Sequence, residues 1–258
     1  MSLRIANREF APRPWAALLT AALLAAFVAL GWWQVGRARE KQAMIDSFQR
    51  GTLSSVDLAG DVTVDELPRY QHVRAEGHYR PEHQVLIDNM PSQAGRPGYR
   101  VLTPFQREGS ERLLLIDRGW VPLGATRQDL PPVFVSPGFR AVSGRLDALP
   151  APGVRVGDAG VATDTSWPRV LNFPRQHDLE QALGAKVEAR IVLLDPSAPD
   201  GYERVWRPAM QFGPERHLGY AIQWFALAIV ALIIFLALSL RRLPGDPLAP
   251  TDSTCGSP

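Results

Sequence analysis

The last long apolar run of the chain begins with a cluster of polar and aromatic side chains. The cluster reads His217-Leu218-Gly219-Tyr220-Ala221-Ile222-Gln223-Trp224-Phe225, and the run continues without a charged residue to Leu240. On a helix, His217, Tyr220 and Trp224 lie close to one face, because residues three or four positions apart are neighbours there. A neutral imidazole can ligate a metal ion or a haem iron. The alternative is a plain interfacial histidine, since an ionisable side chain at the end of a membrane span costs less than a central one.

Similar residue types close an earlier apolar run. Trp32 and Trp33 are followed by Gln34, and Gln223 stands near the corresponding end of the later run. Tryptophans gather at membrane interfaces without any ligand, which is the simpler interpretation of most of these aromatic residues. Polar amides within spans often hydrogen-bond between helices. Gln34 and Gln223 are therefore hypothesised to pair with each other and to hold the two runs together.

A third polar group ends an apolar strand and reads Asp117-Arg118-Gly119-Trp120-Val121-Pro122. Neighbours along a strand point to opposite faces, so Asp117 and Arg118 need not pair with each other. We interpret this stretch mainly as a structural corner. The alternative is a surface, from Arg118 to Pro122, that contacts a partner protein.

The remaining histidines and the single cysteine do not predict a metal centre. His72 and His78 would stand about 20 Å apart on an extended strand, and His83 and His177 are isolated. Cys255 has no second cysteine with which to form a disulfide or a thiolate site. The sequence also lacks hydrolase, zinc-protease and phosphate-loop motifs, so we do not expect an enzyme.

The basic and acidic residues are nearly balanced. The 28 Lys and Arg residues against 26 Asp and Glu residues give a formal net charge of +2. A nucleic-acid-binding protein usually carries a basic patch. We therefore expect no nucleic-acid partner.

Two apolar runs divide the chain, and each is long enough for a membrane-spanning helix, which needs about 20 apolar residues. The bulky Trp32-Trp33 pair replaces the small-residue cleavage site of a signal peptide, which favours a retained anchor. The predicted segments are an N-terminal tail (1–14), a first span (15–35), a central domain (36–217), a second span (218–240) and a disordered tail (241–258).

The arginines of the two tails predict the orientation in the membrane. Positive charge favours the cytoplasmic side, and a long segment such as the central domain translocates largely regardless of charge. We therefore expect a multi-pass protein of a bacterial inner membrane with both termini cytoplasmic and the central domain periplasmic. The tail arginines are Arg4, Arg8, Arg13, Arg241 and Arg242.

The central domain shows short strand-like runs separated by Gly and Pro turns, which favours an antiparallel sheet. Residues 37–50 are predicted to continue the first helix, and 172–183 to form another helix that stops at Gly184. The predicted fold class is a membrane protein whose two transmembrane helices flank an extracytoplasmic, mainly antiparallel β domain with a few helices (α+β). The predicted strand runs are 70–79, 84–88, 99–106, 113–121, 139–146 and 190–194.

Several of these segments together resemble the Surfeit locus protein 1 family. The resemblance covers most of the chain, in matching order. It starts with Gly31-Trp32-Trp33-Gln34-Val35-Gly36-Arg37, which is similar to the family pattern Gly-x-Trp-Gln-x-x-Arg. It continues through Gly77-His78-Tyr79, Gly98-Tyr99-Arg100-Val101-Leu102-Thr103-Pro104-Phe105 and Arg118-Gly119-Trp120-Val121-Pro122, and it ends with the His217 to Phe225 cluster.

The resemblance implies an assembly factor of cytochrome c oxidase that acts with subunit I and other assembly factors around haem a, without catalysis. It implies that His217 is a candidate axial ligand and that an aromatic set surrounds the porphyrin, with Arg37 or Arg216 near the propionates. The alternatives are a scaffold that binds no cofactor and a two-span sensor; the short tail disfavours the sensor. The aromatic set is Trp32, Trp33, Tyr220, Trp224 and Phe225.

Overall fold

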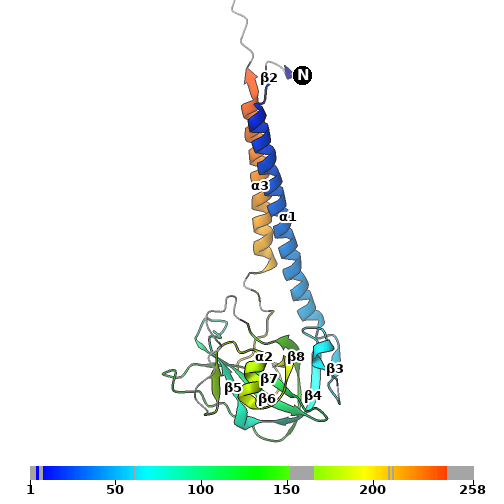
Figure 1. Ribbon diagram of the computed structural model, residues 1–258, viewed down its shortest axis with the longest axis vertical. Helices are drawn as coiled ribbons and strands as arrows, with labels where there is room; N and C mark the ends of the chain where they lie inside the picture. The colour runs from blue at the N-terminus through cyan, green and yellow to red at the C-terminus, as the bar shows by residue number, and fades with distance from the viewer. Residues whose placement is uncertain are drawn as a thin grey trace, which may run out of the picture. The chain divides into compact units, whose positions relative to one another are not determined.

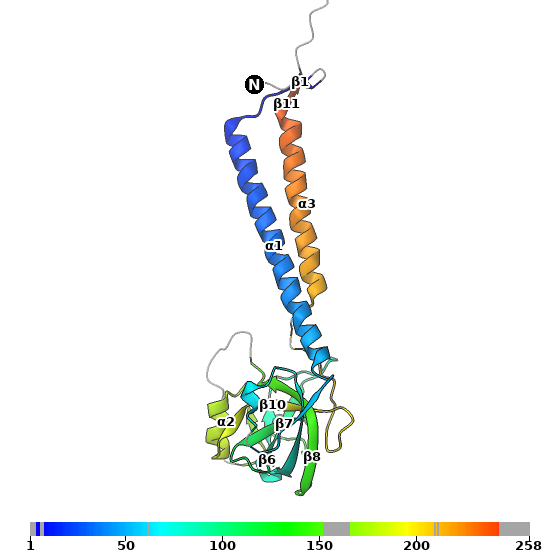
Figure 2. The ribbon, with the colours of Figure 1, turned by 90° about the vertical axis from the view of Figure 1, so that its right-hand side faces the viewer.

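Two long apolar helices, α1 (Pro14–Arg50) and α3 (Pro214–Ser239), lie side by side in the computed structural model (Figures 1 and 2). The structure describes residues 4–5, 8–60, 62–151, 166–208, 210 and 212–242. The chain forms two compact units, residues 1–42 with 210–258 and residues 43–209. Most of the predicted C-terminal tail, including Cys255, lies outside the described residues.

Both helices are long and apolar enough to cross a membrane, as the two uncharged runs predicted. α1 does not stop at the predicted end of the first span. It continues to Arg50 because residues 37–50 are rich in helix-forming side chains, and Gly51 follows it. The predicted extension of the first helix is thus confirmed.

The two helices pack through a regular seam. Partly or fully buried side chains recur on each helix at alternating spacings of three and four residues, which is the heptad pattern of paired helices. Small residues at several of these positions allow close approach of the backbones. The seam contains Ala17, Thr20, Leu24, Phe27, Gly31, Gln34 and Ala38 on α1 and His217, Ala221, Trp224, Ala228, Ala231 and Phe235 on α3.

The chain termini form a small sheet at one end of the helix pair. Strands β1 (Arg4–Ile5), β2 (Arg8–Phe10) and β11 (Leu240–Arg242) pair in the order β1-β2-β11. β2 and β11 are antiparallel, with Leu240 opposite Phe10. The sequence analysis had placed residue 240 in the second span and residues 241–242 in a disordered tail. The structure shows instead that residues 240–242 form strand β11. Their pairing joins chain ends more than 200 residues apart, which no local pattern reveals.

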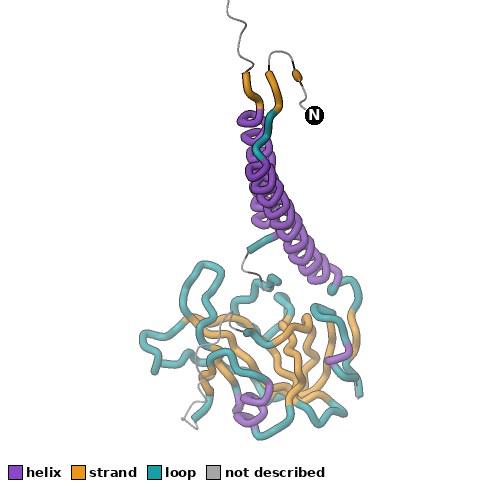
Figure 3. Tube along the Cα trace, turned by 45° about the horizontal axis from the view of Figure 1, so that its top comes forward, coloured by secondary structure: helices purple, strands orange, loops and turns teal. Residues whose placement is uncertain are grey.

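The second unit is a β domain with short helical elements (Figure 3). Six of its strands fall on the six predicted runs, and two further short strands, β3 and β9, were not predicted. Its strands are β3 (Ser55–Asp57), β4 (His72–Tyr79), β5 (Val85–Ile87), β6 (Gly98–Arg107), β7 (Leu113–Pro122), β8 (Phe139–Ala148), β9 (Arg169–Leu171) and β10 (Val187–Leu194), and its helical elements are η1 (Val64–Glu66), η2 (Pro81–His83) and α2 (Gln176–Leu183).

Helix α2 begins four residues later than the sequence predicted. The Asp178 carboxylate accepts a hydrogen bond of 2.8 Å from the Arg175 backbone N–H, and this capping contact fixes the first turn after Pro174. Gly184 ends the helix in the left-handed conformation with φ of 64°, as its position predicted.

Five strands of the β domain close into a ring. The sheet order is β3-β4-β8-β10-β7-β6-β5-β9, and β4 also pairs with β6, which closes β4, β8, β10, β7 and β6 into a barrel. The pairs within the ring are antiparallel except for β7 with β10, which are parallel. The mainly antiparallel sheet is thus confirmed. Numbered along the chain, the ring follows the strand order of the five-stranded OB-fold barrel.

Both faces of the central strands are buried. On β7, Leu114 and Ile116 belong to one hydrophobic cluster and Leu113 and Leu115 to another. Strand β10 alternates between the same two clusters. A strand buried on both faces reads as a continuous apolar run instead of an alternating one. This explains the stretches LLLI and IVLL in the sequence.

Candidate functional site

His217 and Gln34 are hydrogen-bonded across the helix pair. The distance from His217 Nδ1 to Gln34 Oε1 is 2.8 Å, and both side chains are half-buried. An amide oxygen can only accept, so Nδ1 carries the proton and the neutral ring keeps its lone pair on Nε2. A histidine that ligates a metal commonly has its other nitrogen fixed in this way. The arrangement gives His217 the tautomer that a metal ligand needs.

The hypothesis that Gln34 pairs with Gln223 is therefore wrong, because Gln34 pairs with His217. Gln223 is exposed, whereas His217 lies on the packed face of α3 and meets Gln34 on the seam. The spacing of His217, Ala221 and Trp224 along the seam could have indicated this, because Gln223 falls off that heptad line.

Trp224 and Phe225 pack against α1. The Trp224 ring stacks on Phe27 with centroids 5.8 Å apart, and the Phe225 ring meets Trp32 edge to face at 6.0 Å. Gly31 makes room for Phe225, since a Cβ added there would stand 2.6 Å from the ring. Phe27 and Gly31 were not among the predicted site residues, although both lie on the heptad line of α1. These rings thus hold the helices together beside the histidine.

The other predicted aromatic residues point outward. Trp32, Trp33 and Tyr220 are 60%, 57% and 45% exposed. Such rings suit a membrane interface, where an apolar body meets a polar surrounding. They offer flat apolar surface along the chain next to Gln34 on α1 and His217 at the start of α3.

The two arginines predicted near a bound anion differ in availability. Arg37 forms an ion pair of 2.7 Å with Glu40 on the next turn of α1. Arg216 lies over the Phe212 ring at 4.3 Å and has no carboxylate partner among the described residues. Arg216 is therefore the freer cation next to His217.

Arg118 is buried inside the barrel and is only 1% exposed. Its guanidinium donates to the backbone oxygens of Asp200 at 2.6 Å and Phe134 at 2.7 Å, and to Gln84 Oε1 at 2.9 Å. It also lies over the Tyr202 ring at 4.9 Å. Arg118 thus joins segments that are far apart in the sequence.

Asp117 points to the opposite face of β7, as strand alternation predicted. It is buried and accepts hydrogen bonds from Arg100, one of them at 2.7 Å. Burial raises the pKa of the Asp117 carboxyl, and the Arg100 guanidinium opposes this increase. Asp117 and Arg118 therefore have separate partners.

Trp120 does not form an exposed partner surface with Arg118. It is 7% exposed, and its indole N–H donates to the Met90 backbone oxygen at 2.8 Å. The alternative prediction of a partner-binding surface from Arg118 to Pro122 is therefore wrong for these two side chains, because both are buried. They stabilise the barrel because each satisfies buried carbonyl groups.

Tyr79 lies near Arg118 in the barrel, and burial raises the pKa of its phenol to about 12 despite the opposing charge of Arg118. The unfolded-state pKa is about 10. The folded state thus holds the phenol proton of Tyr79 more tightly than the unfolded state does. The stabilisation that results is present below pH 10 and is lost as the pH rises towards 12.

We expect the Tyr79→Phe variant to lose less stability than the wild type between pH 9 and pH 12, by about 2 kcal/mol. Urea unfolding of both proteins across this pH range measures the difference. Parallel stability curves for the two proteins would contradict the prediction.

His72 forms a polar link between strands. Its Nδ1 lies 3.0 Å from Ser55 Oγ on β3, and its Nε2 lies 2.9 Å from Asp195 Oδ2. Ser143 donates to the same Asp195 oxygen at 2.7 Å. The described residues contain no group of three or more His, Cys, Asp or Glu placed to hold a metal ion. We interpret this link as structural.

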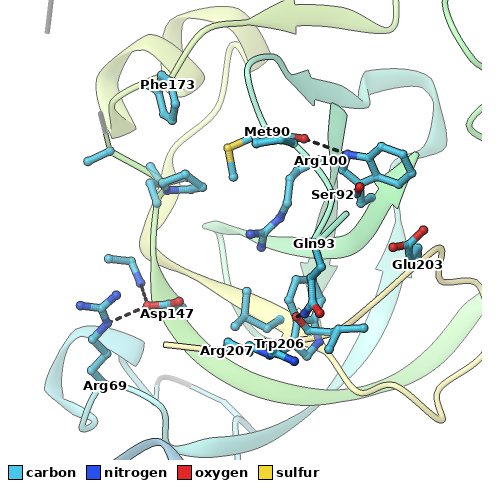
Figure 4. Close-up of a pocket in the computed structure, with 18 residues that line it drawn as sticks. Arg69, Met90, Ser92, Gln93, Arg100, Asp147, Phe173, Glu203, Trp206 and Arg207 are labelled. Carbon is cyan, nitrogen blue, oxygen red and sulfur yellow. Dashed lines mark hydrogen bonds and ion pairs between the residues drawn. The ribbon is translucent and has the colours of Figure 1, made fainter. Parts of the chain in front are cut away.

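A pocket of about 700 Å³ in the β domain was not predicted from the sequence (Figure 4). The Arg100 side chain points into it, with Trp206 and Arg207 along one side. Arg100 lies over the Trp206 ring at 4.7 Å. The adjacent Trp206-Arg207 pair after β10 could have indicated a binding site in the sequence. Arg100 is more than 100 residues away, so the sequence did not show that it lies beside them.

Comparison with known proteins identifies the family of this chain. A sequence profile described as SURF1 family matches residues 21–229. A SURF1-like protein of Rickettsia bellii is 34% identical over 95 residues, which cover 36% of this chain and 38% of that protein. One of Rickettsia conorii is 23% identical over 226 residues, or 85% of this chain and 89% of that protein.

A third relative, from Saccharomyces cerevisiae, has the name Cytochrome oxidase assembly protein SHY1. It is 30% identical over 95 residues, which cover 36% of this chain and 24% of that protein. The alignment with the Rickettsia bellii protein likewise spans less than two thirds of that protein's length. The profile match includes most of both apolar runs and the whole β domain, so the predicted resemblance is confirmed: the chain belongs to the SURF1 family.

Proposed function

We propose that this chain is a membrane-bound assembly factor of cytochrome c oxidase. The observation that supports this most directly is its family membership together with the name of the yeast relative, a cytochrome oxidase assembly protein. The proposed role is binding and positioning without catalysis. Its proposed partners are subunit I of the oxidase and other assembly factors.

We propose that both long helices span a bacterial inner membrane. Their apolar side chains are largely exposed, which would be costly in water and favourable in lipid. The chain termini meet in one small sheet, and the tails carry five arginines. By the positive-inside rule this end is cytoplasmic, and the β domain is periplasmic.

We further propose that the end of the helix pair at His217 receives haem a, with Nε2 of His217 as a ligand to its iron. The hydrogen bond from Nδ1 to Gln34 supports this assignment, because it directs the lone pair of the ring to Nε2. The exposed rings of Trp32, Trp33 and Tyr220 provide apolar surface, and Arg216 provides a cation for a propionate. Bound haem would supply the porphyrin destined for the oxidase.

The His217→Ala variant is expected to lose haem. The full chain is purified in detergent from cells that make haem a, and its visible spectrum is recorded. We expect His217→Ala to retain less than about a tenth of the wild-type haem, and Gln34→Leu to bind it about 10 to 100 times more weakly, as when the hydrogen-bond partner of a metal ligand is removed. His177→Ala, an exposed histidine on α2, is the matched control.

A complementation experiment distinguishes the assembly role from the haem-ligand role of His217. Oxidase maturation is measured in a strain that lacks the chromosomal gene for this protein and carries a plasmid with the wild-type or variant gene. Failure of the wild-type protein to restore the oxidase would refute the assembly role. Normal restoration by a protein without haem, or an unchanged spectrum in His217→Ala, would leave assembly in place and refute the ligand role of His217.

A further inference from the structure

The β-domain pocket, here called the barrel-face pocket, lies on the outer face of the closed ring. Its volume of about 700 Å³ is within the usual range for sites that bind small molecules. Arg100 on β6 and Trp120 on β7 come from the second and third strands of the ring, counted along the chain from β4. The pocket is therefore built on rigid strands as well as on loops.

Three guanidinium groups line the barrel-face pocket, and they are not fully compensated. Arg100 donates Nε and Nη2 to Asp117, and Arg69 donates Nε to Asp147 at 2.7 Å. Neither of these arginines donates another hydrogen bond within the described part of the chain, so further N–H groups are available. Arg207 has no carboxylate partner among the described residues.

Flat apolar surface lies beside these charges. Arg100 is stacked on Trp206, whose indole N–H donates to the Leu194 backbone oxygen at 2.7 Å. Trp120 is held in the same manner by the Met90 backbone oxygen. Both indole rings are therefore fixed in place, so a ligand that contacts them need not order them. Figure 4 shows Arg100 projecting between Met90 and Trp206.

The position of the pocket matches the place where OB-fold barrels bind ligands. These barrels bind through the face of strands 2 and 3 and through the loops that join strands 1 to 2 and 4 to 5. Here Met90 comes from the first of these connections, and Leu149 and Phe173 come from the second. A shared fold does not identify a ligand, so the class of ligand must follow from the side chains.

We propose that the barrel-face pocket binds a small organic anion that carries a flat, conjugated ring. The anionic group is placed at Arg100 and Arg207, where charge-assisted hydrogen bonds are available. The ring lies against the indole of Trp206 or Trp120, as rings stack on aromatic side chains in OB folds. This site is independent of the proposed haem role of His217.

The test uses a fluorinated probe pair of the same ring and similar size, one member an anion and the other neutral. The full chain in lipid nanodiscs is titrated with 6-fluoro-2-naphthoate and with the neutral 6-fluoro-2-naphthamide, and ¹⁹F line broadening is compared with that in empty nanodiscs. We expect saturable binding of the naphthoate with a dissociation constant on the order of 1 mM. The amide should bind at least about fivefold more weakly.

Variants of Arg207 locate the binding. Arg207 is exposed and has no carboxylate partner, so its replacement leaves the fold intact. Arg207→Gln should weaken naphthoate binding about threefold and Arg207→Glu about tenfold. Arg80→Gln, an exposed arginine outside the pocket, is the matched control and should bind like the wild type.

Three outcomes would overturn the proposal. These are the absence of saturable binding above the empty nanodiscs, equal binding of the naphthoate and the amide, and equal affinities of Arg207→Glu and Arg80→Gln. Each of these results leaves the oxidase-maturation and haem measurements unaffected, so failure here is distinct from failure of the proposed function.

Discussion

Replacement of Arg118 by leucine is expected to destabilise the β domain by about 3–5 kcal/mol. The substitution removes a buried guanidinium that satisfies the backbone oxygens of Phe134 and Asp200 and the side chain of Gln84. A carbonyl left buried without a donor costs about 1–3 kcal/mol. Because a folded domain is stable by only about 5–15 kcal/mol in total, this single change removes a large share of the margin.

Urea unfolding of the full chain, followed by tryptophan fluorescence, measures the effect of Arg118→Leu. The matched control is Arg74→Leu. Arg74 is an arginine on β4 whose side chain is about half exposed and pairs with Glu76. Loss of such a surface pair costs at most about 1 kcal/mol. Equal destabilisation by the two substitutions would contradict the proposed role of Arg118 as a buried link.

Replacement of Gly31 by leucine is expected to separate the two apolar helices. A Cβ at Gly31 would stand 2.6 Å from the Phe225 ring, and the longer leucine side chain would have no space beside it. Overpacking of this kind costs about 1–3 kcal/mol. Because the seam also joins His217 to Gln34, displacement at Gly31 should break that hydrogen bond as well.

Cross-linking between the helices measures the separation. Cysteines replace Thr20 and Ala231, which line the same groove, in a Cys255→Ser background, and a short bifunctional thiol reagent joins them. We expect Gly31→Leu to lower the cross-linking yield about tenfold. Gly36→Leu is the control, because a Cβ at Gly36 meets no atom within 4 Å. Similar yields in both variants would show that Gly31 does not set the helix contact.

Most of the predicted strands and helices agree with the structure, because these elements depend on local sequence patterns. Runs of uncharged residues identify long apolar helices by length alone, and Gly184 marks a helix end through its left-handed conformation. The continuous apolar runs around Leu113 and Ile191 indicated buried strands. Their parallel pairing, however, follows from the closed ring and leaves no local signal.

The sequence identified individual residues of the candidate site but not the contacts between them. His217 and Gln34 were each recognised as unusual polar residues at the ends of apolar runs, yet their pairing across 183 positions required the packed helices. Arg118 was taken for part of a corner or a surface because sequence shows a charge but not its burial. The pocket formed by Arg100, Trp206 and Arg207 likewise exists only where the ends of separate strands meet.

The two apolar helices, the strand-rich centre and the membership of the SURF1 family can all be inferred from the sequence without a structure. These properties depend on side-chain type and on spacing along the chain, which the sequence contains in full. The pairing of the polar groups depends instead on the packed fold, which brings together His217 with Gln34, Asp117 with Arg100, and Arg118 with carbonyls of distant loops. A buried polar group is stabilised by whichever partner the fold places within hydrogen-bond distance, and that distance is a property of the packed chain.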